Sequence, residues 1–154
     1  MPIISKMIRR FARHHTLSEK PTIHHERVTL IHTSKTVMPG LLLWDETYDN
    51  CNLVLRYGSR ETTAAEDDYF EAMCSIRLIL ENDGLYPCCY GASRSAYPSS
   101  MSRSMGSGLQ VYKLQLGEPA KMIDLVSIFA EGPDVEPVTV SKQRTFYQEW
   151  LVSL

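Results

Sequence analysis

The sequence predicts one α+β domain, with a mainly antiparallel sheet of about five strands and two helices packed on one face of it. Three observations favour this fold. Short apolar segments end at glycine-rich or aspartate-rich turns, two longer segments have helical spacing, and the 154 residues are 44% hydrophobic and 22% charged. That length and composition are typical of a single soluble domain with a real core.

Five segments have the length and the β-branched or aromatic content of strands. Ordered along the chain, they are 41–44, 51–58, 86–91, 109–116 and 122–130. The last one, MIDLVSIFA, is apolar on both faces apart from Asp124 and Ser127, which predicts a position in the middle of the sheet. A further strand is possible upstream, over Arg27 to His32.

Two segments predict helices. Thr63 and Glu66 have the spacing of a capping box, so the first helix is expected over about 63–82, ending before Gly84. Its apolar stripe would contain Tyr69, Met73, Ile76 and Leu80. Ser141 is expected to cap the second helix, whose apolar face would contain Phe146, Tyr147, Trp150, Leu151 and Leu154.

Charge divides the chain in two. Residues 1–37 hold seven lysines and arginines against two glutamates, a net +5, together with all five histidines, whereas residues 38–154 hold nine basic against sixteen acidic side chains, a net −7. We therefore expect a loosely ordered, basic, His-rich extension over 1–37 and a single acidic α+β domain over 38–154. Met38-Pro39-Gly40 resembles an N-terminus, and both a genuine tail and an upstream start would give this pattern.

Several function classes are disfavoured. Residues 38–154 contain no histidine, so a Ser-His-acid or Cys-His apparatus is not expected. The four cysteines lack a paired CxxC spacing and suit reduced, buried thiols. No metal or cofactor is expected, because the paired histidines of the extension suit a solvated cluster better than a ligand set. The sequence has no apolar run of membrane-spanning length and no secretory signal, which favours the cytoplasm and no membrane partner.

The stretch YGASRSAYPSSMSRSMGSG, residues 90–108, is unusually long for a connection and is rich in serine. A phosphate-binding loop would use Arg94, Arg103 and the glycines, but the stretch lacks a Walker lysine and a following helix. A nucleic-acid site would place arginines and tyrosines on a domain that repels phosphates. We favour binding of a macromolecular partner, or docking on the core by a helical turn containing Tyr97, Met101 and Met105.

Acidic residues gather in two places. Asp45, Glu46 and Asp49 lie in the first turn, and Glu66, Asp67, Asp68 and Glu71 begin the predicted helix. Such carboxylates perform acid-base chemistry or hold a metal in some proteins, and in others they form a solvated face at a helix N-terminus. A third interpretation is an acidic surface that docks onto a basic protein.

The runs LILENDGLYPCCYGASRSAYPSSMSRSMGSGLQVYKLQLGEPA and DLVSIFAEGPDVEPVTVSKQRTFYQEWL resemble the small cytoplasmic immunity proteins that bacteria encode beside polymorphic toxins of contact-dependent or type VI systems. The resemblance covers about 41–154 and implies a non-enzymatic inhibitor that binds the C-terminal domain of its cognate toxin. If that toxin is a nuclease, carboxylates such as Asp45, Glu46, Asp67 and Asp68 would match its basic groove. The expected partner-binding residues are Asp45, Glu46, Asp49, Asp67, Asp68, Arg94, Tyr97 and Arg103.

Two other classes compete with the inhibitor. One is a small enzyme or ligand-binding domain that holds an anionic small molecule through Arg60, Arg94 and Arg103, with Ser93, Ser95 and Tyr97 as polar contacts. Convergence of these arginines on a deep pocket would favour it. The other is a nucleic-acid accessory protein acting through the basic extension, since the body itself carries net negative charge.

Overall fold

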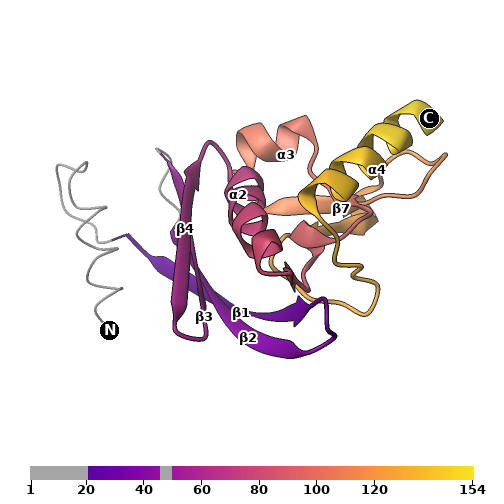
Figure 1. Ribbon diagram of the computed structural model, residues 1–154. Helices are drawn as coiled ribbons and strands as arrows, with labels where there is room; N and C mark the ends of the chain where they lie inside the picture. The colour runs from indigo at the N-terminus through magenta and orange to yellow at the C-terminus, as the bar shows by residue number, and fades with distance from the viewer. Residues whose placement is uncertain (1–20, 46–49) are drawn as a thin grey trace.

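The computed structural model describes residues 21–45 and 50–154, which form an α+β architecture with two antiparallel sheets (Figure 1). The larger sheet has the order β4-β3-β2-β1-β5, from Ile23–His32 (β1), Val37–Asp45 (β2), Cys51–Tyr57 (β3), Arg60–Glu66 (β4) and Leu85–Pro87 (β5). The smaller has the order β6-β7-β8, from Ala96–Tyr97 (β6), Gln110–Lys113 (β7) and Leu125–Ser127 (β8). The predicted fold class is confirmed.

Three described helices lie on one side of the larger sheet (Figure 1). They are Tyr69–Asn82 (α2), Ser100–Met105 (α3) and Val140–Ser153 (α4). Helix α2 packs directly on β3, β4 and β5, while α4 contacts α2 and β6. The core between sheet and helix is fully buried, with Leu30, Leu42 and Leu55 facing residues such as Phe70 and Met73. No described helix is long and apolar enough to cross a membrane.

The expected extension is wrong for residues 23–37, because β1 is an interior strand of the sheet. It pairs with β2 from Ile23↔Asp45 to Ile31↔Val37 and with β5 at Leu30↔Pro87 and its neighbours. Val28 and Leu30 are buried in the core. Side chains alternate along a strand, so His24 and Glu26 lie on the same side of β1 as Val28 and Leu30. Because His24 and Glu26 are polar, the first half of β1 lacks the apolar alternation that would predict a strand. Residues 1–20 lie outside the described part of the chain.

The first helix begins later than predicted, and the proposed capping box is wrong. Thr63 lies in β4, which pairs with β3 along its whole length. Asp68 caps α2 instead, since its Oδ1 accepts a hydrogen bond of 2.8 Å from the Glu71 amide. The expected apolar stripe is confirmed: Tyr69, Met73, Ile76 and Leu80 are all buried.

Two more expectations need correction. Residues 122–130 do not form a central strand, because a short 3-10 helix (Met122–Asp124, η2) precedes β8, which lies at an edge of the smaller sheet. Helix α4 is capped by Thr139 rather than Ser141, through a hydrogen bond of 3.1 Å from the Lys142 amide. On its apolar face Phe146 and Trp150 are buried, whereas Leu151 and Leu154 are exposed.

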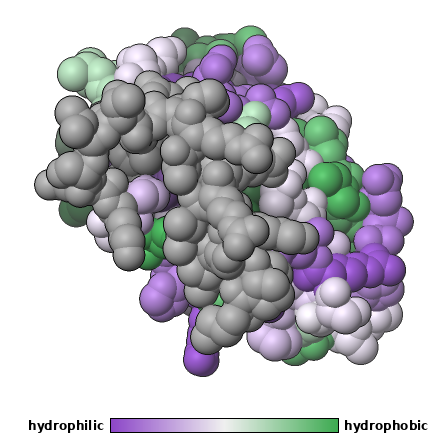
Figure 2. All heavy atoms as spheres, turned by 90° about the vertical axis from the view of Figure 1, so that its left-hand side faces the viewer, coloured by the Kyte–Doolittle hydropathy of each residue, from purple (hydrophilic) through white to green (hydrophobic). Residues whose placement is uncertain are grey.

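The side of the molecule that Figure 2 presents carries small hydrophobic patches between hydrophilic residues, where described atoms are visible. The large apolar side chains of the core are enclosed instead between the sheet and α2. Burial of that interior is the main favourable contribution to folding.

A chain that starts at Met38 lacks β1, so we expect it to lose the cooperative unfolding transition in circular dichroism. The full chain with Leu30→Ala should still unfold cooperatively, with a free energy of unfolding lower by about 2–5 kcal/mol. Val37→Ala is the matched control, since Val37 is exposed. A cooperative transition of the shortened chain would show that the sheet does not require β1.

Candidate functional site

Five of the eight expected partner-binding residues lie around the N-terminus of α2. Asp45 ends β2, Asp67 and Asp68 join β4 to α2, Tyr97 belongs to β6, and Arg103 belongs to α3. We call these five residues the α2 cluster. Glu46 and Asp49 lie outside the described residues.

Tyr69 and Cys51 hold the acidic part of the α2 cluster together. The Tyr69 hydroxyl donates a hydrogen bond to the backbone oxygen of Asp45 and lies 3.2 Å from its Oδ1. The Cys51 thiol donates to the Asp67 carbonyl at 3.7 Å. Burial, and then the charges of Asp68, Asp45 and Asp67, raise the pKa of Cys51 to about 11. The three aspartates therefore surround one thiol.

Arg103 connects α3 to the beginning of α2. Its Nη1 lies 2.9 Å from Glu71 Oε1 and 3.4 Å from Asp68 Oδ2, and its Nη2 lies 3.5 Å from the Tyr97 hydroxyl. Burial opposes the positive charge, but the hydrogen bond with Glu71 and the attraction of Asp68 outweigh it, so the pKa of Arg103 is raised. The guanidinium is thus neutralised within the protein, and its structural role is to fix α3.

The turn after α3 closes over the same helix end. The Ser107 carbonyl accepts a hydrogen bond of 2.8 Å from the Tyr69 amide. Gly108 has a φ of +66° and approaches the Asp68 carboxylate so closely that a Cβ there would lie 2.7 Å from Oδ1. Only glycine combines this backbone conformation with this contact.

Exposure within the α2 cluster is uneven. Asp45 is fully buried and Asp68 is 6% exposed, so neither faces solvent, whereas Asp67 is exposed. Helix α3 presents Met101 and Met105 to solvent, at 70% and 82% exposure. The expected docking of these methionines on the core is therefore wrong, because Arg103 supplies the contact of α3 with α2. The surface of this end combines one carboxylate with two flexible apolar side chains.

Sequence reasoning missed two features of this surface. The sequence indicates Glu71 only as one acid at the helix start, yet it pairs with Arg103 and lies 3.6 Å from Arg144 of α4. The outward direction of the methionines was also missed. A signal for it exists in SMSRSM, a helix whose only apolar residues are methionines.

The remaining arginines lie elsewhere. Arg60 pairs with Asp83 at 2.8 Å, and the guanidinium of Arg94 lies 4.7 Å from the centre of the Phe146 ring. Arg60 and Arg103 therefore contact opposite ends of α2, whereas Arg94 contacts α4. The structure does not gather them into the anion site that the competing interpretation requires.

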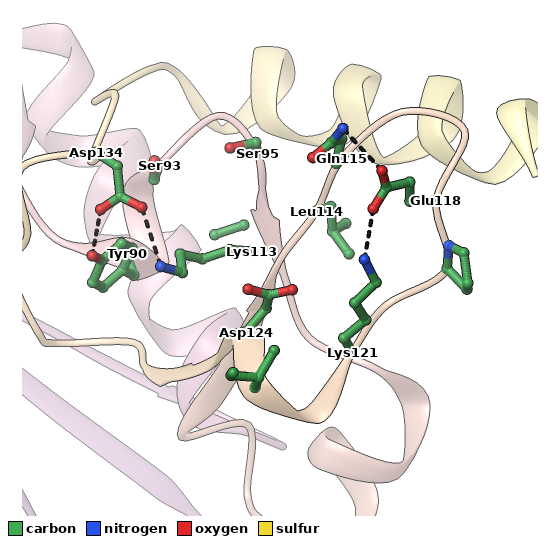
Figure 3. A pocket seen from close by; sticks show the side chains of 13 residues that line it. Tyr90, Ser93, Ser95, Lys113, Leu114, Gln115, Glu118, Lys121, Asp124 and Asp134 are labelled. Atoms are coloured by element: carbon green, nitrogen blue, oxygen red, sulfur yellow. Dashed lines mark hydrogen bonds and ion pairs between the residues drawn. The ribbon is translucent and has the colours of Figure 1, made fainter.

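A cavity of about 470 Å³ opens between η1 (the 3-10 turn Tyr90–Ala92), β7 and the loop after β7 (Figure 3). Ser93 and Ser95 line it as part of the expected ligand set, but none of the three arginines does. Asp134 accepts a hydrogen bond of 2.5 Å from the Tyr90 hydroxyl and lies 3.3 Å from Lys113 Nζ, while Lys121 pairs with Glu118 at 2.8 Å. The Tyr90 hydrogen bond lowers the pKa of Asp134. Asp124 brings the lining to three carboxylates against two ammonium groups, which disfavours an anionic ligand.

Metal ligands and thiols also bear on the question of catalysis. Within 21–45 and 50–154, no group of three or more His, Cys, Asp or Glu side chains is placed to hold a metal. Burial raises the pKa of Cys74 to about 11 and of Cys89 to about 12, so these thiols are protonated near neutral pH.

No family model matches the chain, and no significant match was found among curated proteins. The function must therefore be argued from the geometry above.

We expect Gly108→Ala to destabilise the protein more than Gly117→Ala. Both positions have a positive φ, which costs an alanine about 1 kcal/mol, but only Gly108 has a close neighbour. The contact with Asp68 should add roughly 1–3 kcal/mol, because the cap of α2 is displaced. Urea unfolding of the two variants measures the difference. Equal losses would mean that the Asp68 contact contributes nothing.

The buried thiols predict a loss of stability in alkali. A thiol whose pKa rises from 9.0 to about 11 on folding, as for Cys74, contributes fully below pH 9, and that contribution disappears as the pH rises towards 11. Its loss amounts to at most about 1.4 kcal/mol per pH unit. Urea unfolding from pH 7 to 11 should show a steeper decline for the unmodified chain than for Cys74→Ala. Parallel curves would contradict the prediction.

Proposed function

We propose that this chain is an immunity protein, which binds the C-terminal domain of a cognate toxin and neutralises it by covering its active site or substrate groove. The observation that supports this best is the surface beside the α2 cluster, where exposed Asp67, Met101 and Met105 project from rigidly tied elements. We call these three residues the docking surface.

Rigidity favours a binding role for the docking surface. Helix α3 is fixed by the ion pairs of Arg103, and the loop before α2 is fixed by the Asp68 cap and the Tyr69 hydrogen bonds. A surface ordered before binding loses little conformational entropy on association. The two methionines add adaptable apolar area that fits varied partner surfaces.

Charge gives the docking surface a preference for basic partners. Asp67 is exposed and supplies a negative field at this surface, whereas Asp68 behind it is paired with Arg103. Such a field raises the association rate with a positively charged protein and disfavours acidic ones. A nuclease domain with a basic substrate groove has the matching charge, so we place nucleases first among the candidate toxins.

The experiment is co-expression of the full chain with the C-terminal domain encoded by an adjacent large secreted-protein gene. We expect restored growth and a stoichiometric complex on co-purification. Asp67→Lys combined with Met105→Glu should weaken that complex at least tenfold, equivalent to about 1.4 kcal/mol. Glu149→Lys is the matched control, because Glu149 is also an exposed acid but lies on α4, away from the docking surface.

Two results would overturn the proposal. Undiminished toxicity with both proteins present would remove the inhibitor function. A complex weakened equally by Glu149→Lys and by the docking-surface variant would show that general charge, and not this surface, determines binding.

A further inference from the structure

We propose that the outer edge of β4 pairs with the same edge of a second copy of this chain, so that two larger sheets join into one across a two-fold axis. The two edges of the larger sheet differ in a way that points to this. Strand β5 has three residues and ends in Pro87, which is typical of a protected edge. Strand β4 has seven residues, RETTAAE, with no proline or lysine.

Regular geometry makes β4 suitable for pairing. Its register with β3 runs without a bulge from Cys51↔Glu66 to Tyr57↔Arg60. Among the described residues, no strand pairs with its other edge. A long, regular edge offers a row of backbone donors and acceptors to an incoming strand.

The sequence of β4 is complementary to itself when antiparallel. A two-fold axis at Thr63 places Arg60 opposite Glu66 of the second copy, and the reverse pair forms by symmetry. Thr62 then lies opposite Ala64, and Thr63 opposite Thr63. The pairing therefore joins opposite charges at both ends and small side chains in the middle, which is favourable for directly opposed residues.

An exposed apolar side chain beside β4 supports the same surface. Ile79 of α2 is 44% exposed. Helix α2 is tied to both ends of β4, by the Ser75–Glu66 hydrogen bond of 3.0 Å and by the Arg60–Asp83 ion pair. Ile79 lies one helical turn from each of Ser75 and Asp83, so it belongs to the stripe that follows β4. In the dimer it extends towards Thr62 and Ala64 of the second copy and loses exposed apolar surface.

The mass of the full chain in solution, measured by sedimentation velocity at 1–100 µM in steps of about tenfold, tests the dimer. We expect twice the 17.6 kDa of the chain at the upper concentrations. Thr63→Lys places two ammonium groups opposite each other at the axis, so it should raise the dissociation constant at least tenfold. Gln110→Lys is the matched control, since it adds the same charge at an exposed strand position of the smaller sheet. Circular dichroism checks that both variants fold.

Charge reversal separates pairing between copies from contacts within one copy. Arg60→Glu and Glu66→Arg should each weaken the dimer, and the double variant should restore it. The contacts with Asp83 and Ser75 are lost in the double variant too, so restoration can come only from the second copy. A monomer at all concentrations, a Thr63→Lys dimer as strong as the unmodified one, or no restoration in the double variant would overturn the proposal.

Discussion

The buried guanidinium of Arg77, a residue of α2, binds Gln143 of α4 and the backbone of the segments that begin at Tyr90 and precede α4. Arg77 and Gln143 are each 1% exposed. Arg77 donates to the carbonyls of Gly91 (3.1 Å) and Val138 (2.9 Å) and to Gln143 Oε1 (2.5 Å). Gln143 Nε2 in turn lies within 3.1 Å of three carbonyl oxygens, those of Gly91, Ser93 and Ala96. Burial lowers the pKa of Arg77, yet an arginine keeps its charge in a protein. Backbone dipoles must therefore stabilise that charge, which fixes residues 90–96 against α2 and α4.

This constraint explains the serine-rich stretch. Residues 90–108 are largely a folded connection: η1 and Ser93 are buried, and several of the serines bind backbone groups. Ser93 Oγ accepts from the Glu136 amide at 2.9 Å, Ser99 caps α3 through the Ser102 amide at 3.0 Å, and Ser102 Oγ donates to the Gln110 carbonyl at 2.7 Å. Most backbone groups of this stretch are not paired within a sheet or a long helix. A serine hydroxyl can serve as the hydrogen-bond partner of such a backbone group. Within this stretch, the outer side of α3 is the surface that remains exposed for a partner.

The sequence allows the fold class and the buried stripe of α2 to be predicted, because both follow from local periodicity. It reveals only the second half of β1, as a possible strand over Arg27 to His32, and it does not reveal β4. His24 and Glu26 interrupt the apolar side of β1, and the strand forms because β2 and β5 pair with it on either side. Thr63 and Glu66 satisfy a helix-start pattern, but pairing with β3 outweighs that weak local preference. For the candidate site, the residue types at the start of α2 could be predicted, whereas their exposure could not. Whether Asp67 or Asp68 faces solvent depends on Gly108 and Arg103, which approach from a different part of the chain.

The two proposed surfaces are adjacent in sequence and compatible in space. Asp67 directly follows Glu66, the last residue of β4. In the antiparallel dimer the two copies of Asp67 lie on opposite sides of the axis, each four residues from Thr63. At roughly 3.4 Å per residue, this separates them by about 27 Å along the strands. The exposed carboxylates then lie towards opposite ends of the joined sheet. Dimerisation would also hold the loop between β4 and α2 more firmly, since the strand that leads into it gains a second neighbour. A dimer through β4 therefore places one docking surface at each end of the joined sheet and makes each more rigid.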